Sequence, residues 1–107
     1  MTNFDERKRG FEADFARDQD LTFRITARRN RLLGLWAAER LGIAAGEAAD
    51  EYAKTVVAAD FEKPGDDDVV EKVHGDLVAK GVDISASEIR AELGRAAILA
   101  REQLTGK

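Results

Sequence analysis

The sequence contains no cysteine, one proline, one histidine and no long uncharged hydrophobic run. The lack of cysteine excludes a disulfide framework, a zinc ribbon and a thiol nucleophile, and it favours a reducing, cytoplasmic setting. No segment approaches the roughly 20 apolar residues that a membrane span requires, and the charged N-terminus is unlike a secretory signal. We therefore expect the 107 residues to form one small soluble domain that depends on packing alone for its stability.

Neither sign of charge dominates, because the sequence has 17 basic and 21 acidic residues and a net charge of -4. This balance argues against a dedicated nucleic-acid binder and against a polybasic membrane module. The charge is unevenly distributed: nine basic and seven acidic residues lie in positions 1–40, against eight basic and fourteen acidic residues in positions 41–107. The two halves of the chain can therefore face different partners.

Glycine and proline are scarce outside a few positions, while alanine, glutamate, arginine and leucine are abundant, so the sequence predicts helix nearly throughout. The first three expected helices are Phe4 to Asp18, Leu21 to Leu41 and Ala45 to Phe61, and Asp20 is the expected cap of the second. The fourth begins at Asp66-Asp67-Asp68 and ends at Gly81. The fifth begins at the capping box Ser85-Ala86-Ser87-Glu88. We predict an all-α fold: an N-terminal amphipathic helical arm (residues 1–18) followed by a four-helix antiparallel bundle (residues 19–107).

The second expected helix has the widest apolar face of the five. Burying a leucine or tryptophan side chain stabilises a fold by ~1.5–3 kcal/mol. The residues that form this face are Ile25, Leu32, Leu33, Trp36, Ala37 and Leu41. We expect the core to centre on Trp36.

Residues for catalysis or metal binding are few, and we do not expect an enzyme. A nucleophile needs a base beside it, and the single histidine, His74, is predicted to be a surface residue. The run Asp66-Asp67-Asp68 lacks the ligand spacing of a calcium loop and is better explained as a helix start. The sequence therefore predicts no catalytic residue, no metal site and no required cofactor.

The expected arm combines three phenylalanines with a largely charged surface. Phe4, Phe11 and Phe15 lie along one narrow stripe of a helix, which buries little by itself. Two interpretations stay open: the arm folds back on the bundle, or it inserts into a groove of a partner. Docking on a membrane surface is disfavoured, because the polar face mixes both signs of charge.

A second candidate site is the arginine face formed by Arg24, Arg28 and Arg31, which are spaced by four and three residues. These side chains can form ion pairs within the chain, or they can contact a partner or the phosphates of a weakly bound adenine nucleotide. Nucleic acid is disfavoured by the acidic remainder of the chain. The chain also lacks a long heptad seam, so we expect a monomer.

The sequence contains the runs Ala27 to Glu39 (ARRNRLLGLWAAE), Tyr52-Ala53-Lys54, Val56 to Phe61 (VVAADF), Gly65 to Val69 (GDDDV) and Asp76-Leu77 to Gly81. These runs, spread over residues 27–81, resemble the alphaproteobacterial F-type ATP synthase zeta subunit family. The resemblance implies a small helical protein that binds the catalytic head of the ATP synthase and inhibits ATP hydrolysis. It also implies that the N-terminal helix is the inhibitory element.

The resemblance further implies that the arm inserts at a catalytic αβ interface near the rotor stalk, so that the α, β and γ subunits are the partners. The expected apolar anchors are Phe4, Phe11 and Phe15, and the expected charged contacts are Arg7, Lys8, Arg9 and Arg17. The protein would then be cytoplasmic and held at the inner face of the plasma membrane only through the synthase. The alternative is a small acidic helical adaptor that binds another protein or an adenine nucleotide without inhibiting the ATPase, and RNA binding is a third hypothesis.

Overall fold

The computed structural model describes the backbone of residues 3–62 and 66–106, and the side chains of residues 19–60 and 66–106. In these ranges the secondary structure consists of four helices, in the order α1 (Asn3–Arg40), α2 (Glu47–Glu62), α3 (Asp66–Ala79) and α4 (Ala86–Thr105). The predicted all-helical fold is confirmed. The finer prediction of an antiparallel bundle stays a prediction.

The prediction of two separate helices before position 42 is wrong, because α1 is one helix of 38 residues. Asp20 was expected to cap a new helix, but it lies inside α1 and is exposed. The sequence between Asp18 and Leu21 contains no glycine or proline, and an interior aspartate costs a helix only a few tenths of a kcal/mol. Continuing an existing helix is cheaper than ending it and nucleating another.

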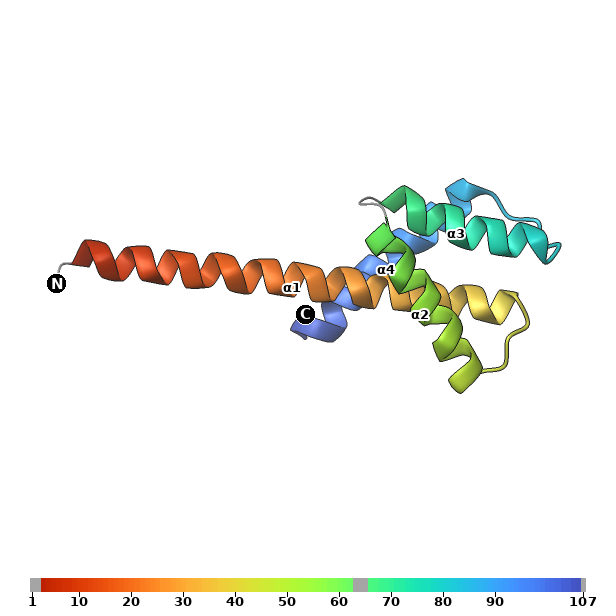
Figure 1. The fold of residues 1–107 in the computed structure, drawn as a ribbon, viewed down its shortest axis with the longest axis horizontal. Helices are drawn as coiled ribbons and strands as arrows, with labels where there is room; N and C mark the ends of the chain where they lie inside the picture. The colour runs from red at the N-terminus through yellow and green to blue at the C-terminus, as the bar shows by residue number, and fades with distance from the viewer. Residues whose placement is uncertain (1–2, 63–65, 107) are drawn as a thin grey trace.

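Residues 3–18 of the expected arm therefore form the N-terminal part of α1. Figure 1 shows this part extending away from α2, α3 and α4, which gather around the C-terminal half of α1. The molecule measures 65 × 25 × 21 Å along its principal axes. A helix of 38 residues spans about 57 Å, so α1 accounts for most of the long dimension.

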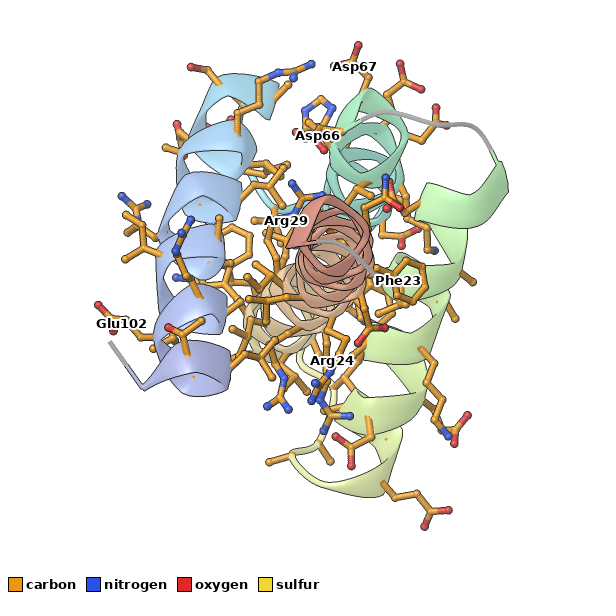
Figure 2. The ribbon with its side chains drawn as sticks, turned by 90° about the vertical axis from the view of Figure 1, so that its left-hand side faces the viewer. Phe23, Arg24, Arg29, Asp66, Asp67 and Glu102 are labelled. Carbon is orange, nitrogen blue, oxygen red and sulfur yellow. The ribbon has the colours of Figure 1, made fainter. Side chains whose placement is uncertain are left out.

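The other three helices surround α1 unequally. Helix α1 packs against α2, α3 and α4, whereas α2 and α4 do not contact each other in the described parts of the chain. Figure 2 looks along α1 and shows α2 and α4 on its two sides, with α3 above it. Each of the other three helices therefore packs against α1.

The core consists of small and branched residues and does not centre on Trp36. Trp36 is only partly buried and lies against the edge of the core, where the Arg40 guanidinium stacks 4.1 Å from its ring centroid. The largest fully buried side chains are Leu33, Leu77, Ile89, Val56, Val69, Val70, Val73 and Asn30.

Two helix ends follow from the sequence as expected. Ser85 caps α4, and its hydroxyl accepts a hydrogen bond of 3.1 Å from the Glu88 backbone N–H. Gly81 has φ +85° just after α3, a conformation that residues other than glycine rarely adopt. The capping box and the glycine stop were both readable from the sequence because each rests on local chemistry.

Candidate functional site

The seven residues predicted for the inhibitory arm all lie in the N-terminal part of α1. These residues are Phe4, Arg7, Lys8, Arg9, Phe11, Phe15 and Arg17. Their side chains lie outside the described residues. The structure therefore places their backbone on one continuous helix, and their individual roles stay predictions.

The three residues of the arginine face are all exposed on the C-terminal half of α1. Arg31 forms an ion pair with Asp50 of α2, with Nη2 and Oδ1 separated by 3.1 Å. Arg28 donates a hydrogen bond of 3.3 Å to the neutral Gln103 side chain of α4. Pairing within the chain therefore occurs, but among described residues it gives a carboxylate partner only to Arg31.

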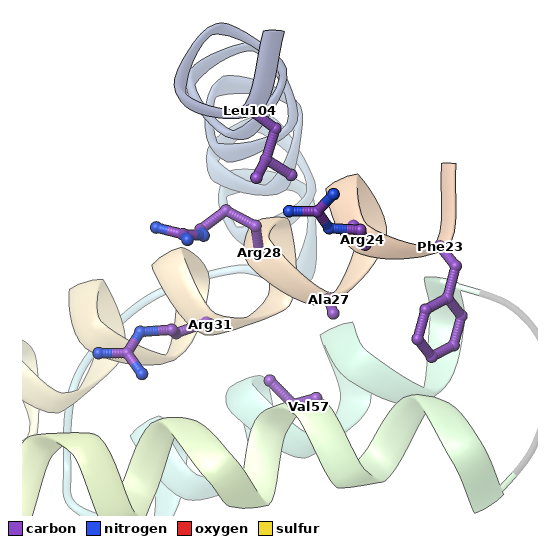
Figure 3. A pocket seen from close by; sticks show the side chains of 7 residues that line it. All are labelled: Phe23, Arg24, Ala27, Arg28, Arg31, Val57 and Leu104. Carbon is purple, nitrogen blue, oxygen red and sulfur yellow. The ribbon is translucent and has the colours of Figure 1, made fainter. Parts of the chain in front are cut away.

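The arginine face borders a groove between α1, α2 and the C-terminal part of α4. Its volume is about 510 Å³, and its lining residues are Phe23, Arg24, Ala27, Arg28, Arg31, Val57 and Leu104. Figure 3 shows the three arginines following one another along α1, with Leu104 on one side and Val57 on the other. We call this feature the arginine groove.

Basic character continues beside the arginine groove along α2. A second hollow of about 230 Å³ is lined by Arg31, Lys54, Val57 and Ala58. The Lys54 ammonium lies 3.0 Å from the Glu51 carboxylate one turn earlier, and both side chains are largely exposed. Exposed pairs of this kind contribute little to stability, so Lys54 remains accessible to an external anion.

A fourth arginine of the same sequence run has a different role. Arg29 is mostly buried, and its Nη2 lies 3.0 Å from Oδ1 of Asp66 at the start of α3. Its Nε donates a hydrogen bond of 3.0 Å to Oδ1 of the fully buried Asn30. Figure 2 shows Arg29 on the side of α1 near α3 and Arg24 on the opposite side. Arg29 therefore joins α1 to α3, whereas Arg24 faces the arginine groove.

A polar cluster joins α2 to α3. The Asp76 carboxylate accepts hydrogen bonds of 2.8 Å from the Tyr52 hydroxyl and from the Lys72 ammonium. Burial acts to raise the pKa of Asp76, but these two bonds and the positive charge of Lys72 outweigh it and lower that pKa. Burial, the bond to Asp76 and its negative charge raise the pKa of Tyr52. The cluster is a structural link between helices.

His74 is partly buried, and the hypothesis that it has no catalytic or metal-binding role stays a prediction. Its Nε2 lies 3.1 Å from the carbonyl oxygen of Ile84, in the segment that leads into α4. Asp67 likewise connects two elements, because its Oδ1 lies 2.6 Å from Arg90 Nη2 of α4. Within the residues that the structure covers, no group of three or more His, Cys, Asp or Glu side chains could hold a metal ion.

Sequence reasoning found the arginines of the groove but missed the residues that complete it. Val57 and Leu104 come from α2 and α4, and no local pattern tells that these helices meet on the same side of α1. Phe23 precedes Arg24 on α1, and its side chain is 57% exposed. Its apolar character is visible in the sequence, but its position at the edge of a groove depends on tertiary structure.

The fold and the site together define a small helical binding protein, with surfaces on one long helix and a groove beside it. In the parts of the chain that are described, no helix is both long and apolar enough to cross a membrane. The sequence matches the model of the ATPase inhibitor subunit zeta family over residues 1–103. The chain belongs to this family, as the sequence resemblance predicted.

Comparison with solved structures supports the same fold. One chain solved by solution NMR is 44% identical and superposes with a TM-score of 0.70 over 80% of this chain and 96% of that one. No curated protein matches the sequence. The family is that of an ATPase inhibitor subunit, which indicates a regulatory protein that interacts with the ATP synthase.

Proposed function

We propose that this protein inhibits ATP hydrolysis by the F-type ATP synthase by inserting the N-terminal part of α1 at a catalytic αβ interface near the rotor stalk. The observation that carries the proposal is the continuity of α1 from Asn3 to Arg40, with its N-terminal part extending away from the other helices. The helical residues 3–18 span about 24 Å. A helix of this length can enter a deep interface while the remainder of the fold stays outside.

The composition of the arm supports this mode of binding. Helix-in-groove recognition uses apolar anchors spaced by about one or two turns, and Phe4, Phe11 and Phe15 have spacings of seven and four. Arg7, Lys8, Arg9 and Arg17 would meet acidic surfaces of the partner, which increases the rate and the specificity of binding. The α, β and γ subunits of the catalytic head are the proposed partners.

The proposed mechanism depends on a rigid connection between the arm and the packed part of the fold. Because α1 passes without a break from the arm into the packed core, a load on the arm is carried into the fold through Leu33 and Ala37. An inserted helix that cannot swing freely holds the catalytic interface closed and blocks rotation in the direction of hydrolysis. No chemical step by this chain is required.

The proposal also fixes where the protein acts. As a free chain it would be a monomer, and it would sit at the inner face of the plasma membrane only through the synthase. Membership of the ATPase inhibitor family and the proposed contact with the catalytic head support this placement.

The test is ATP hydrolysis by a purified alphaproteobacterial F-type ATPase, titrated with the full chain and with a chain lacking residues 1–17. The described buried side chains all lie at or after Asn30, so the shortened chain keeps them, and circular dichroism checks its fold. Inhibition by the full chain alone is the expected result. Equal inhibition by both chains would contradict the role of the arm.

The same titration separates the alternative functions. If the full chain binds the enzyme but neither chain inhibits it, the protein is a bound subunit without an inhibitory arm. If neither chain binds, the interpretation as an acidic adaptor for another protein or a nucleotide replaces the proposal.

A further inference from the structure

The arginine groove contains more positive charge than the fold uses. Arg24 and Arg28 are four residues apart on α1, where like charges on neighbouring turns destabilise a helix slightly. Among the described side chains, Arg28 has only the neutral Gln103 as a partner. Within the described part of the chain, no hydrogen bond or ion pair is formed by the Arg24 guanidinium. In an acidic chain, this local excess of cations is suited to an external anionic group.

The groove combines these cations with apolar surface. Val57 of α2 and Leu104 of α4 border it on two sides, and both are partly buried. Phe23 extends the apolar border toward the arm. A ligand that fills the groove must therefore offer negative groups on one side and apolar groups beside them.

The arrangement fits an extended partner better than a compact anion. From Arg24 to Arg31 the chain rises about 10 Å along the axis of α1, and Figure 3 shows the arginines in a row instead of around one point. A phosphate site is usually built from backbone N–H groups at a helix start or in a glycine loop. The groove lies instead along the middle of α1. Carboxylates spaced by three or four residues on a second helix would match the row.

The groove also lies close to the arm. Arg24 follows Arg17 by seven residues on the same helix, which is about 10 Å. A partner that holds the arm therefore extends past the groove or ends beside it. This continuity identifies the proposed partner of the arm as the source of the acidic helix.

We propose that the arginine groove binds an acidic amphipathic helix of the F-type ATPase as a second contact surface, separate from the arm. This inference rests on the proposed function, because it names the same enzyme. Arg24 and Arg28 bind carboxylates of the partner helix, and Val57 and Leu104 contact its apolar side. The groove thus anchors the body of the protein while the arm occupies the catalytic interface.

The first experiment measures binding of the full chain to purified, immobilised F-type ATPase by biolayer interferometry at several salt concentrations. The groove variant is Arg24→Gln/Arg28→Gln. The charge-matched control is Lys80→Gln/Arg95→Gln, which changes two exposed cations elsewhere on the surface. Thermal unfolding of each variant confirms that it is folded.

We expect the groove variant to bind at least tenfold more weakly and to show a smaller salt dependence, because two charge pairs are lost. The control should remain within twofold of the natural chain. Equal binding by the groove variant would overturn the inference while the proposed function stands. If the natural chain itself does not bind, the proposed function and this inference both fail.

The second experiment identifies what occupies the groove. Because the chain has no cysteine, a benzophenone can be attached at one position only, in Val57→Cys or, as a control, in Val78→Cys on exposed surface of α3. The groove probe should cross-link to an ATPase helix with carboxylates three or four residues apart, and the control probe should not. Cross-links to a segment without this pattern, or protection by inorganic phosphate alone, would overturn the proposed occupant.

Discussion

At the scale of single residues, Gly34 sets how closely α1 approaches α2. A Cβ atom at this position would lie 2.7 Å from the Ala53 Cα and 3.1 Å from its Cβ. The obstacle is backbone and cannot rotate away. The absence of a side chain at Gly34 is therefore a requirement of the helix packing.

We expect Gly34→Ala to lower the free energy of unfolding by about 1–3 kcal/mol, because the two helices must separate. Gly75→Ala and Gly94→Ala are matched controls, since nothing lies within 4 Å of a Cβ at either position. Alanine in an open helix position should stabilise by about 0.5–1 kcal/mol. Urea unfolding of the three variants tests the prediction, and the same sign of effect at all three sites would contradict it.

The cluster of Tyr52, Lys72 and Asp76 predicts a pH dependence of stability. The pKa of Asp76 is lower in the folded protein than in an unfolded chain. Its contribution to stability is therefore fully present above the unfolded pKa of about 3.9 and is lost as the pH falls through the folded pKa.

Asp76→Asn should reduce the free energy of unfolding by about 1 kcal/mol at pH 7, because charged hydrogen bonds become neutral ones. The difference from the natural chain should shrink toward pH 2, where Asp76 is itself protonated. Asp83→Asn, at an exposed position after α3, is the control. Chemical unfolding at both pH values measures the effect, and a difference that does not change with pH would refute the assignment.

At the scale of elements, helix ends with local capping chemistry were predictable. Ser85 accepts a hydrogen bond from the Glu88 N–H at the start of α4. Ser85→Ala should therefore cost about 1 kcal/mol of stability. Ser87→Ala, two residues later and inside the helix, should change stability by less than about 0.5 kcal/mol. Thermal unfolding compares the two variants, and equal losses would show that the cap is not used.

The sequence predicted the class of fold and most helix positions, because glycine, proline and capping residues act locally. It failed where two local signals competed. Asp20 is a good cap, but without a helix breaker nearby the chain continues as helix through it. Trp36 is the largest apolar residue of its face, yet it is only partly buried and lies against the edge of the core. The first outcome depends on the free energy of extending the preceding helix, and the second depends on nonlocal packing.

The candidate site was also only partly predictable from the sequence. Arg24, Arg28 and Arg31 share a face because of their spacing alone, and the structure places all three along one groove. That Arg29 lies on another face follows from the rotation of about 100° per residue, but its pairing with Asp66 depends on tertiary structure. The far sides of the groove, Val57 and Leu104, required knowledge of which helices meet.

At the scale of the whole molecule, the account rests on the continuity of α1. The part of α1 beyond the other helices can act as a lever only if it is rigidly joined to the packed part. Proline inside a helix removes a backbone hydrogen bond and clashes with the preceding turn, which breaks or kinks the helix. Asp20 is an exposed position near this junction.

The most direct test is therefore the concentration for half-maximal inhibition of ATP hydrolysis by the F-type ATPase, measured for Asp20→Pro and Asp20→Ala. Both changes remove the same side chain, but only proline interrupts α1. The account predicts at least a tenfold higher concentration for Asp20→Pro and little change for Asp20→Ala, with similar thermal stability of both. Equal inhibition by the two variants would contradict the central claim that one unbroken helix transmits the inhibition.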